Sequence, residues 1–163
     1  MENKDLNKWT WTWTPSPVMN WMIATILRLP VLHHLLSKMM LVITFTGKKS
    51  GKTYVTPVGY YREGNRVTIL TKRFRKWWLN FETAAPVEVL ITGHSYAAQA
   101  ASLTDTEIIS PIIAHVVEKH RGDAQNYGIK LGNNGKADME SVREVAAKLV
   151  VVQLILTPEK IID

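Results

Sequence analysis

The chain has 163 residues, enough for one domain with a sizeable hydrophobic core, and an apolar fraction of 46% argues against wholesale disorder. The balance of 20 lysines and arginines against 14 acidic residues gives a net charge of +6, which favours anionic partners. The lack of cysteine excludes disulfides, thiolate nucleophiles and iron–sulfur clusters, and the five histidines have no metal-ligand spacing, so no metal is expected.

Residues 1–38 are expected to form an N-terminal arm and an N-terminal helix. Tryptophans alternate with threonines in the arm, and the helix is expected to stop or kink at Pro30. No apolar run reaches the roughly 18–20 residues that span a bilayer. A helix packed on the domain and an interfacial helix that contacts a membrane through residues 9–36 both remain open. We expect a cytoplasmic protein, with peripheral contact to the inner face of the membrane as the alternative.

Residues 39–103 carry the strand signals of a barrel. The expected strands are 40–46, 53–62, 66–71, 87–92 and 96–103. Short turns join most of them, at residues 47–52, around Gly64 and around Gly93. Five strands in so short a span indicate an antiparallel sheet that closes into a barrel. A short helix is expected just after the third strand.

After residue 103 the spacing of apolar residues changes from that of strands to that of helices. A helix is expected at 105–120, a loop-rich segment at 122–136 and a second helix at 138–148, so that residues 104–148 form a helical insertion. Residues 149–157 are expected to form the final strand, which is apolar on both faces and is therefore placed centrally. The sequence thus predicts one α+β domain over residues 1–163.

The turn between the first two expected strands, residues 47–52, is called the basic loop below. It carries Lys48, Lys49 and Lys52 around Ser50 and Gly51. Small residues let backbone N–H groups approach a ligand, and lysine and serine add donors for phosphate or carboxylate oxygens. The spacing is not that of a P-loop. The loop alone fits a solvated basic turn at a sheet edge equally well.

Four further cations follow the third strand and precede two tryptophans. They are Lys72, Arg73, Arg75 and Lys76, followed by Trp77 and Trp78. In an antiparallel meander, this cluster and the basic loop lie at the same end of the sheet and face one anionic ligand. A solvated loop with core tryptophans is the alternative. No nucleic-acid partner is expected, because aromatic residues do not recur along exposed strand faces.

No acid, base or nucleophile set stands out in the spacing of the polar residues. If the chain is an enzyme, a cofactor carries the difficult chemistry and the protein supplies binding and orientation. The motifs that bear on this question are, in chain order, TGKKSGKTYVTPVGYYREGNRV, KWWLNF and APVEVLITG. Together they resemble the deazaflavin (F420)-dependent nitroreductase family of the flavin/deazaflavin oxidoreductases.

The resemblance covers residues 38–101 and implies a fold. Members have a split β-barrel related in architecture to pyridoxamine 5′-phosphate oxidase. For this chain it implies an α+β fold with a split β-barrel of antiparallel strands, of the FMN-binding split barrel type, with flanking helices and an N-terminal helix. The final strand also fits this fold.

The resemblance implies F420 as the cofactor, with FMN as the alternative. F420 is a deazaflavin whose tail carries phosphate and glutamyl carboxylates, and the family's basic loop grips that tail. The implied cofactor-binding residues are Lys48, Lys49, Ser50, Gly51, Lys72, Arg73, Trp78 and Asn80. The ring is implied to lie against Thr56, Pro57, Leu70 and Thr71. Tyr54 stands where the family often has arginine, which weakens one tail contact.

The implied activity is transfer of a hydride from reduced F420 to a small organic acceptor, such as a quinone, nitroaromatic or enone. Tyr60, Tyr61 and Tyr127 are weak candidates for contacting the acceptor or supplying a proton. The alternative is a non-catalytic split-barrel protein that binds a flavin, haem or another anionic ligand, with membrane association left open. A monomer and a homodimer are both compatible with the resemblance.

Overall fold

The computed structural model describes residues 39–160, with side chains described for residues 39–157. The expected N-terminal arm, its helix and the membrane contact through residues 9–36 lie outside the described residues. Within the described part, the chain forms two compact units. The barrel unit comprises residues 39–104 and 150–160, and the helical unit comprises residues 105–149. The expectation of one domain over the whole chain stays a prediction.

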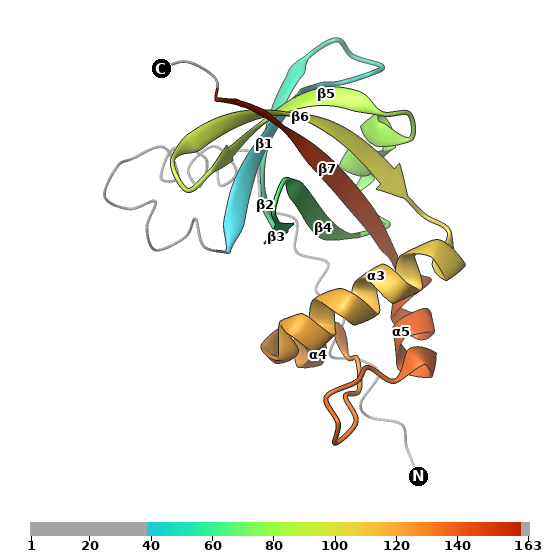
Figure 1. Ribbon diagram of the computed structural model, residues 1–163. Helices are drawn as coiled ribbons and strands as arrows, with labels where there is room; N and C mark the ends of the chain where they lie inside the picture. Colours follow the sequence, from blue (N-terminus) through green and yellow to red (C-terminus); the bar gives the residue numbers. More distant parts are fainter. Residues whose placement is uncertain (1–38, 161–163) are drawn as a thin grey trace. The chain divides into compact units, whose positions relative to one another are not determined.

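The barrel unit is built on a curled seven-stranded sheet (Figure 1). Its strands are β1 (Met40–Thr46), β2 (Thr53–Gly59), β3 (Tyr61–Glu63), β4 (Arg66–Lys72), β5 (Ala85–Ile91), β6 (His94–Leu103) and β7 (Leu149–Lys160). Their order is β2-β1-β5-β6-β7-β4-β3. The pairs β1–β2, β1–β5, β3–β4, β5–β6 and β6–β7 are antiparallel. The curl brings β2 close to β4, and the sheet confirms the predicted α+β split-barrel fold.

Alternation along the strands places the core inside the curl. Leu41, Ile43 and Phe45 of β1 are buried in one cluster, whereas Val42 is buried in a separate cluster on the opposite face. Strand β7 lies between β6 and β4, so its predicted central place is confirmed. It is longer than the expected strand 149–157.

The expected strand 53–62 is wrong, because the chain forms two strands there. Strand β2 pairs with β1, whereas β3 pairs with β4 at the other edge of the sheet. The chain changes edges around Tyr60, where the regular strand is interrupted. The expected simple meander is also wrong, since β4 is hydrogen-bonded between β7 and β3 and approaches β2 only through the curl.

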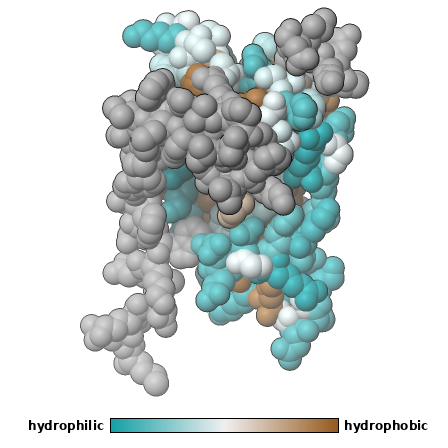
Figure 2. Space-filling view, turned by 90° about the vertical axis from the view of Figure 1, so that its left-hand side faces the viewer, coloured by the Kyte–Doolittle hydropathy of each residue, from teal (hydrophilic) through white to brown (hydrophobic). Residues whose placement is uncertain are grey.

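The helical unit contains α3 (Thr106–Lys119), α4 (Arg121–Tyr127) and α5 (Met139–Ala146). Asp105 caps α3 by accepting Glu107 N–H at 2.9 Å, and Asp138 caps α5 by accepting Ser141 N–H at 3.1 Å. Both helices were predicted from the sequence, at 105–120 and 138–148, and the structure confirms them. Figure 2 shows that the visible surface at the height of these helices is mainly hydrophilic.

The expected loop at 122–136 is partly wrong, because α4 occupies its first half. Gly122 in the first turn weakens the helix signal in the sequence. The helix is nevertheless anchored by buried Ala124, and it ends at Gly128, whose φ of 72° is left-handed. No helix in the described part of the chain is long and apolar enough to cross a membrane.

Candidate functional site

The basic loop is a closed turn between β1 and β2. Gly47 N–H donates to Lys52 O and Gly51 N–H donates to Gly47 O, both at 2.8 Å. Gly51 has a φ of 66°, a conformation that favours glycine. A Cβ on Gly47 would lie 2.5 Å from the Tyr54 ring and 2.6 Å from Ser50 Oγ, so only glycine fits without movement. The loop conformation is therefore defined by its own backbone.

A 3₁₀ helix, η2 (Lys76–Phe81), holds the loop from the other side. Phe81 is buried and contacts Phe45 of β1 edge-on, with ring centroids 5.1 Å apart, which fixes the helix against the sheet. Asn80 Oδ1 then accepts Lys48 N–H at 2.9 Å, and Asn80 Nδ2 donates to Trp77 O at 2.8 Å. One amide side chain thus ties the basic loop to η2.

A pocket of about 400 Å³ lies between the basic loop and η2. The described residues that line it are Gly47, Lys48, Lys49, Ser50, Tyr54, Lys76, Leu79, Asn80 and Glu82. Within the described residues, no hydrogen bond or ion pair engages the ammonium groups of Lys48, Lys49 and Lys76. Three such cations against one carboxylate, that of Glu82, make this pocket suited to an anion.

Ser50 and Tyr54 form the polar wall of the pocket. Their hydroxyl oxygens are 3.1 Å apart, and Ser50 Oγ also accepts Lys52 N–H at 3.3 Å. The Tyr54 ring stacks on Phe45, with centroids 5.6 Å apart and an interplanar angle of 22°. The tyrosine is still 44% exposed, so its hydroxyl can be reached from the pocket side.

Most of the second basic cluster is engaged with the protein instead. The Arg73 guanidinium donates to Thr104 O, and Trp78 Nε1 donates to Arg73 O at 3.1 Å. Lys72 Nζ lies 5.9 Å from the centroid of the Phe74 ring, and burial, followed by the nearby Arg75, lowers the pKa of Lys72. Only Lys76 of this cluster is among the described residues that line the pocket.

The four residues predicted to face a ring are divided between two faces. On β2, Thr56 shares the face of the core residue Val58, whereas Pro57 points the other way. On β4, Thr71 lies on the core face and Leu70 on the opposite one. Thr71 is also buried, and its Oγ1 accepts Trp77 Nε1 at 3.3 Å. A flat ligand on one face can therefore contact the side chains of only two of the four residues.

The three candidate tyrosines belong to different elements. Tyr60 lies at the break between β2 and β3 and packs against the core. Burial raises its pKa, with Arg62 opposing the shift and Tyr96 adding to it. Tyr61 begins β3, and Tyr127 ends α4 in the helical unit.

Five residues that line the pocket are absent from the cofactor-binding residues that the resemblance implies. They are Gly47, Tyr54, Lys76, Leu79 and Glu82. Lys76 was singled out by the sequence only as a member of the second basic cluster, and it opens the same short helix that carries Asn80. Tyr54 was discounted for lacking charge, although alternation places it on the same face as Thr56. Among the described residues, no group of three or more acidic or histidine side chains could hold a metal.

A protein family matches most of this chain. Residues 27–130 match the model of the family described as F420H(2)-dependent quinone reductase. No curated protein sequence matches the chain.

Several solved structures are distantly similar. One described as a domain-swapped dimer has 17% identity and a TM-score of 0.49, covering 86% of this chain and 99% of its own. The general stress FMN/FAD binding protein from Xanthomonas citri has 12% identity and a TM-score of 0.43, with coverages of 86% and 85%. A structure described as an F420 reductase has 11% identity and a TM-score of 0.41, with coverages of 82% and 91%.

Proposed function

Because this chain belongs to the F420H2-dependent quinone reductase family, we propose that it binds reduced F420 and reduces a quinone. The membership confirms the resemblance to F420-dependent reductases that the sequence motifs indicated. The observation that carries the proposal is the pocket between the basic loop and η2, with its three cationic side chains. When bound, F420 supplies a hydride donor, so the protein needs no redox group of its own.

The donors of the pocket fit the charged tail of such a cofactor. Phosphate and carboxylate oxygens only accept hydrogen bonds, and the pocket offers the ammonium groups of Lys48, Lys49 and Lys76 together with the Ser50 hydroxyl. Gly51 shapes the loop through its left-handed backbone. These residues bind the anion, and their positive charge raises the local concentration of an anionic cofactor.

The remaining predicted residues have supporting roles in the proposal. Asn80 holds the loop, and the Arg73–Trp78 hydrogen bond holds the connection between β4 and η2. Lys72 ends β4 and adds charge beside this connection. The ring is assigned to the neighbourhood of β2 and β4, where Thr56 and Thr71 lie on one face of the sheet and Pro57 and Leu70 on the other.

Reduction of a quinone to a quinol requires a proton in addition to the hydride. Tyr60 is the candidate that we assign to this role, with Tyr61 and Tyr127 as the other two. Burial keeps the Tyr60 hydroxyl protonated, because it disfavours the charged phenolate. Tyr60→Phe is expected to reduce kcat by about a hundredfold, a typical contribution of a proton donor. An unchanged kcat would remove Tyr60 from the proposal.

The proposal is tested by binding and turnover of the purified full-length protein. F420 fluorescence titration is expected to show binding in the micromolar range or tighter. Reduced F420 is then expected to be oxidised when menadione is added, and a nitroaromatic or an enone in its place defines the acceptor range. Parallel titrations with FMN and haem test the alternative ligands. Failure of F420 to bind would overturn the proposal, whereas binding without turnover of any acceptor would favour the non-catalytic alternative.

A further inference from the structure

The surroundings of Ser50 restrict where its hydroxyl hydrogen can point. A hydroxyl group has one hydrogen to donate and two lone pairs that accept. One lone pair of Ser50 Oγ accepts Lys52 N–H at 3.3 Å. The Tyr54 hydroxyl, 3.1 Å away, either donates to the second lone pair or accepts the hydrogen of Ser50. The direction of this one bond decides what Ser50 offers to the pocket.

The phenol is the better donor of the two hydroxyls. A phenolic O–H is in general a stronger hydrogen-bond donor than the O–H of an aliphatic alcohol such as serine, because the aromatic ring withdraws electron density from the oxygen. We propose that Tyr54 donates to Ser50 Oγ and thereby directs the Ser50 hydroxyl hydrogen toward an oxyanion in the pocket. The inference rests on the proposed function, because it names the residue that orients a donor for the anionic tail.

The position of Tyr54 is fixed by contacts that do not involve a ligand. Its ring stacks on buried Phe45, and the missing Cβ of Gly47 leaves the space that the ring occupies. A larger residue at 47 would displace both the ring and Ser50 Oγ. The tyrosine is therefore a positioning residue: it acts on the ligand through Ser50.

This arrangement selects for a particular kind of ligand atom. A hydroxyl oxygen whose two lone pairs already accept hydrogen bonds cannot accept another one from a ligand N–H or O–H group. It favours an oxygen that only accepts, as in an ionised phosphate or carboxylate. In this chain Tyr54 thus supplies orientation at the position where the resemblance leads one to expect the charge of an arginine.

A double-mutant cycle tests the inference. F420 dissociation constants are measured for the wild type, Ser50→Ala, Tyr54→Phe and the double variant. Each single change is expected to raise the Kd about tenfold, because Ser50→Ala removes the hydrogen bond to the charged group and Tyr54→Phe removes the contact that orients it. The double variant is expected to match Ser50→Ala alone, because Tyr54 has no effect without the serine hydroxyl.

A matched control removes a tyrosine hydroxyl elsewhere. Tyr96→Phe leaves the ring that Arg62 contacts, and Tyr96 is not among the described lining residues, so the Kd is expected to be unchanged. Thermal unfolding of all variants establishes that they are folded. Tyr54→Phe keeps the ring that stacks on Phe45, and this limits the structural change.

Two results would overturn the inference. One is a Kd for Tyr54→Phe equal to that of the wild type. The other is a double variant about a hundredfold weaker, which would mean that Tyr54 and Ser50 contact the ligand independently. If the wild type does not bind F420, the proposed function fails. The same four proteins are then titrated with inorganic phosphate, where the same pattern would uphold the role of Tyr54 and absence of binding would refute it.

Discussion

Asn80 Oδ1 accepts a hydrogen bond from Lys48 N–H over 2.9 Å, although the two residues are 32 positions apart in the chain. The same side chain donates to Trp77 O, so it connects the basic loop to η2. The loop is therefore held by the protein itself. A site that is organised in advance loses less conformational freedom when a ligand binds.

Replacement of Asn80 tests whether this organisation matters. Asn80→Ala removes both hydrogen bonds and is expected to raise the Kd for F420 about five- to tenfold, equivalent to about 1 kcal/mol. We expect the free energy of unfolding to fall by about 1 kcal/mol for the same reason. Fluorescence titration and urea unfolding measure the two quantities.

A matched control is provided by Gln99 of β6, an exposed amide that is not among the described lining residues. Gln99→Ala is expected to bind F420 like the wild type. An Asn80→Ala variant that is folded and has the wild-type Kd would show that the hydrogen bond of Asn80 to the loop does not contribute to F420 binding.

Substitution of a lysine that lines the pocket should weaken F420 binding more than substitution of Lys52, the remaining lysine of the basic loop. Lys49→Ala and Lys76→Ala are each expected to weaken F420 binding about two- to fivefold, because an exposed ion pair contributes about 0.2–1 kcal/mol. The effect should shrink as salt is raised, since added ions screen exposed charges. Titrations at low and high salt check both expectations.

Lys52 provides the matched control for these variants. It lies in the same loop and is exposed, but it is not among the described residues that line the pocket. Lys52→Ala is expected to change affinity less than Lys49→Ala does. Equal effects of the two substitutions would indicate that the loop attracts F420 through its net charge and that the pocket has no special part.

Where local patterns decide the structure, the sequence predicted it well. The expected strand 40–46 has the bounds of β1, because a short run of apolar and β-branched residues that ends at a glycine turn defines it locally. The strand 53–62 was not predicted correctly, because its division depends on which distant strand each half pairs with. Tyr60 marks that division, and nothing in its neighbours' propensities distinguishes a change of sheet edge from a continuous strand.

In the candidate site, too, the features set by neighbouring residues could be predicted and those set by long-range contacts could not. The basic loop could be recognised because its lysines, serine and glycine are adjacent in the sequence. The contribution of Lys76 depends on the way Asn80 brings η2 to the loop, which is a long-range contact. Tyr54 was judged by its missing charge, whereas its importance lies in a hydrogen bond to Ser50 and a stack on Phe45.

Tyr60 should leave a signature in the stability of the protein at high pH. Its pKa is raised above the ordinary value of 10.0, mainly by burial, so the folded state retains this proton longer than the unfolded state. The stabilisation is therefore fully present below about pH 10 and is lost as pH rises through the raised pKa. Wild type is expected to lose stability relative to Tyr60→Phe in that range. Urea unfolding at several alkaline pH values measures the difference in the free energy of unfolding between the two proteins. A difference that does not change with pH would contradict the raised pKa of Tyr60.

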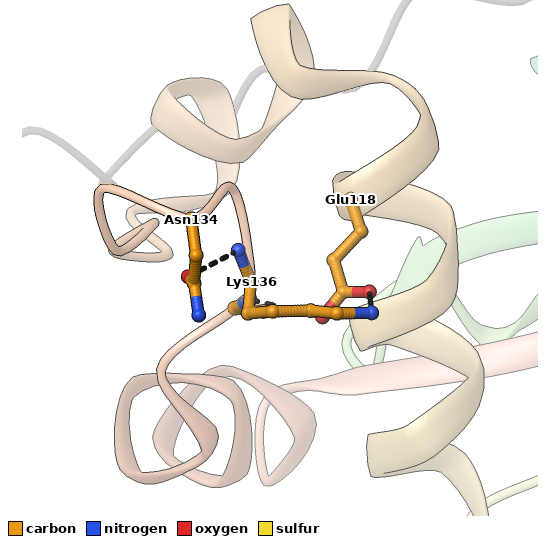
Figure 3. A network of polar contacts seen from close by, with 4 residues as sticks. Glu118, Asn134 and Lys136 are labelled. Carbon is orange, nitrogen blue, oxygen red and sulfur yellow. Dashed lines mark hydrogen bonds and ion pairs between the residues drawn. The ribbon is translucent and has the colours of Figure 1, made fainter.

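Glu118 should have the opposite pH dependence, within the helical unit. Figure 3 shows its carboxylate between α3 and the loop that carries Asn134 and Lys136, which lies between α4 and α5 in the chain. The carboxylate of Glu118 accepts hydrogen bonds from Ala137 N–H and from Lys136 Nζ, both at 3.0 Å. The backbone N–H of Lys136 donates to Asn134 Oδ1. The backbone hydrogen bond, followed by the bond from Lys136, lowers the pKa of Glu118 below its ordinary 4.5.

The sign of the effect follows from the lowered pKa. The carboxylate stabilises the folded state above about pH 4.5, and this contribution disappears as pH falls through the lowered pKa. Glu118→Gln keeps an oxygen that can accept Ala137 N–H but removes the charge. Its thermal midpoint is therefore expected to lie below that of the wild type at pH 7 and to converge with it in acid. Glu144→Gln, at an exposed position of α5, is the control and should follow the wild type throughout. A gap between wild type and Glu118→Gln that stays constant from pH 7 into acid would mean that the loop is held by the hydrogen bond alone, without help from the charge.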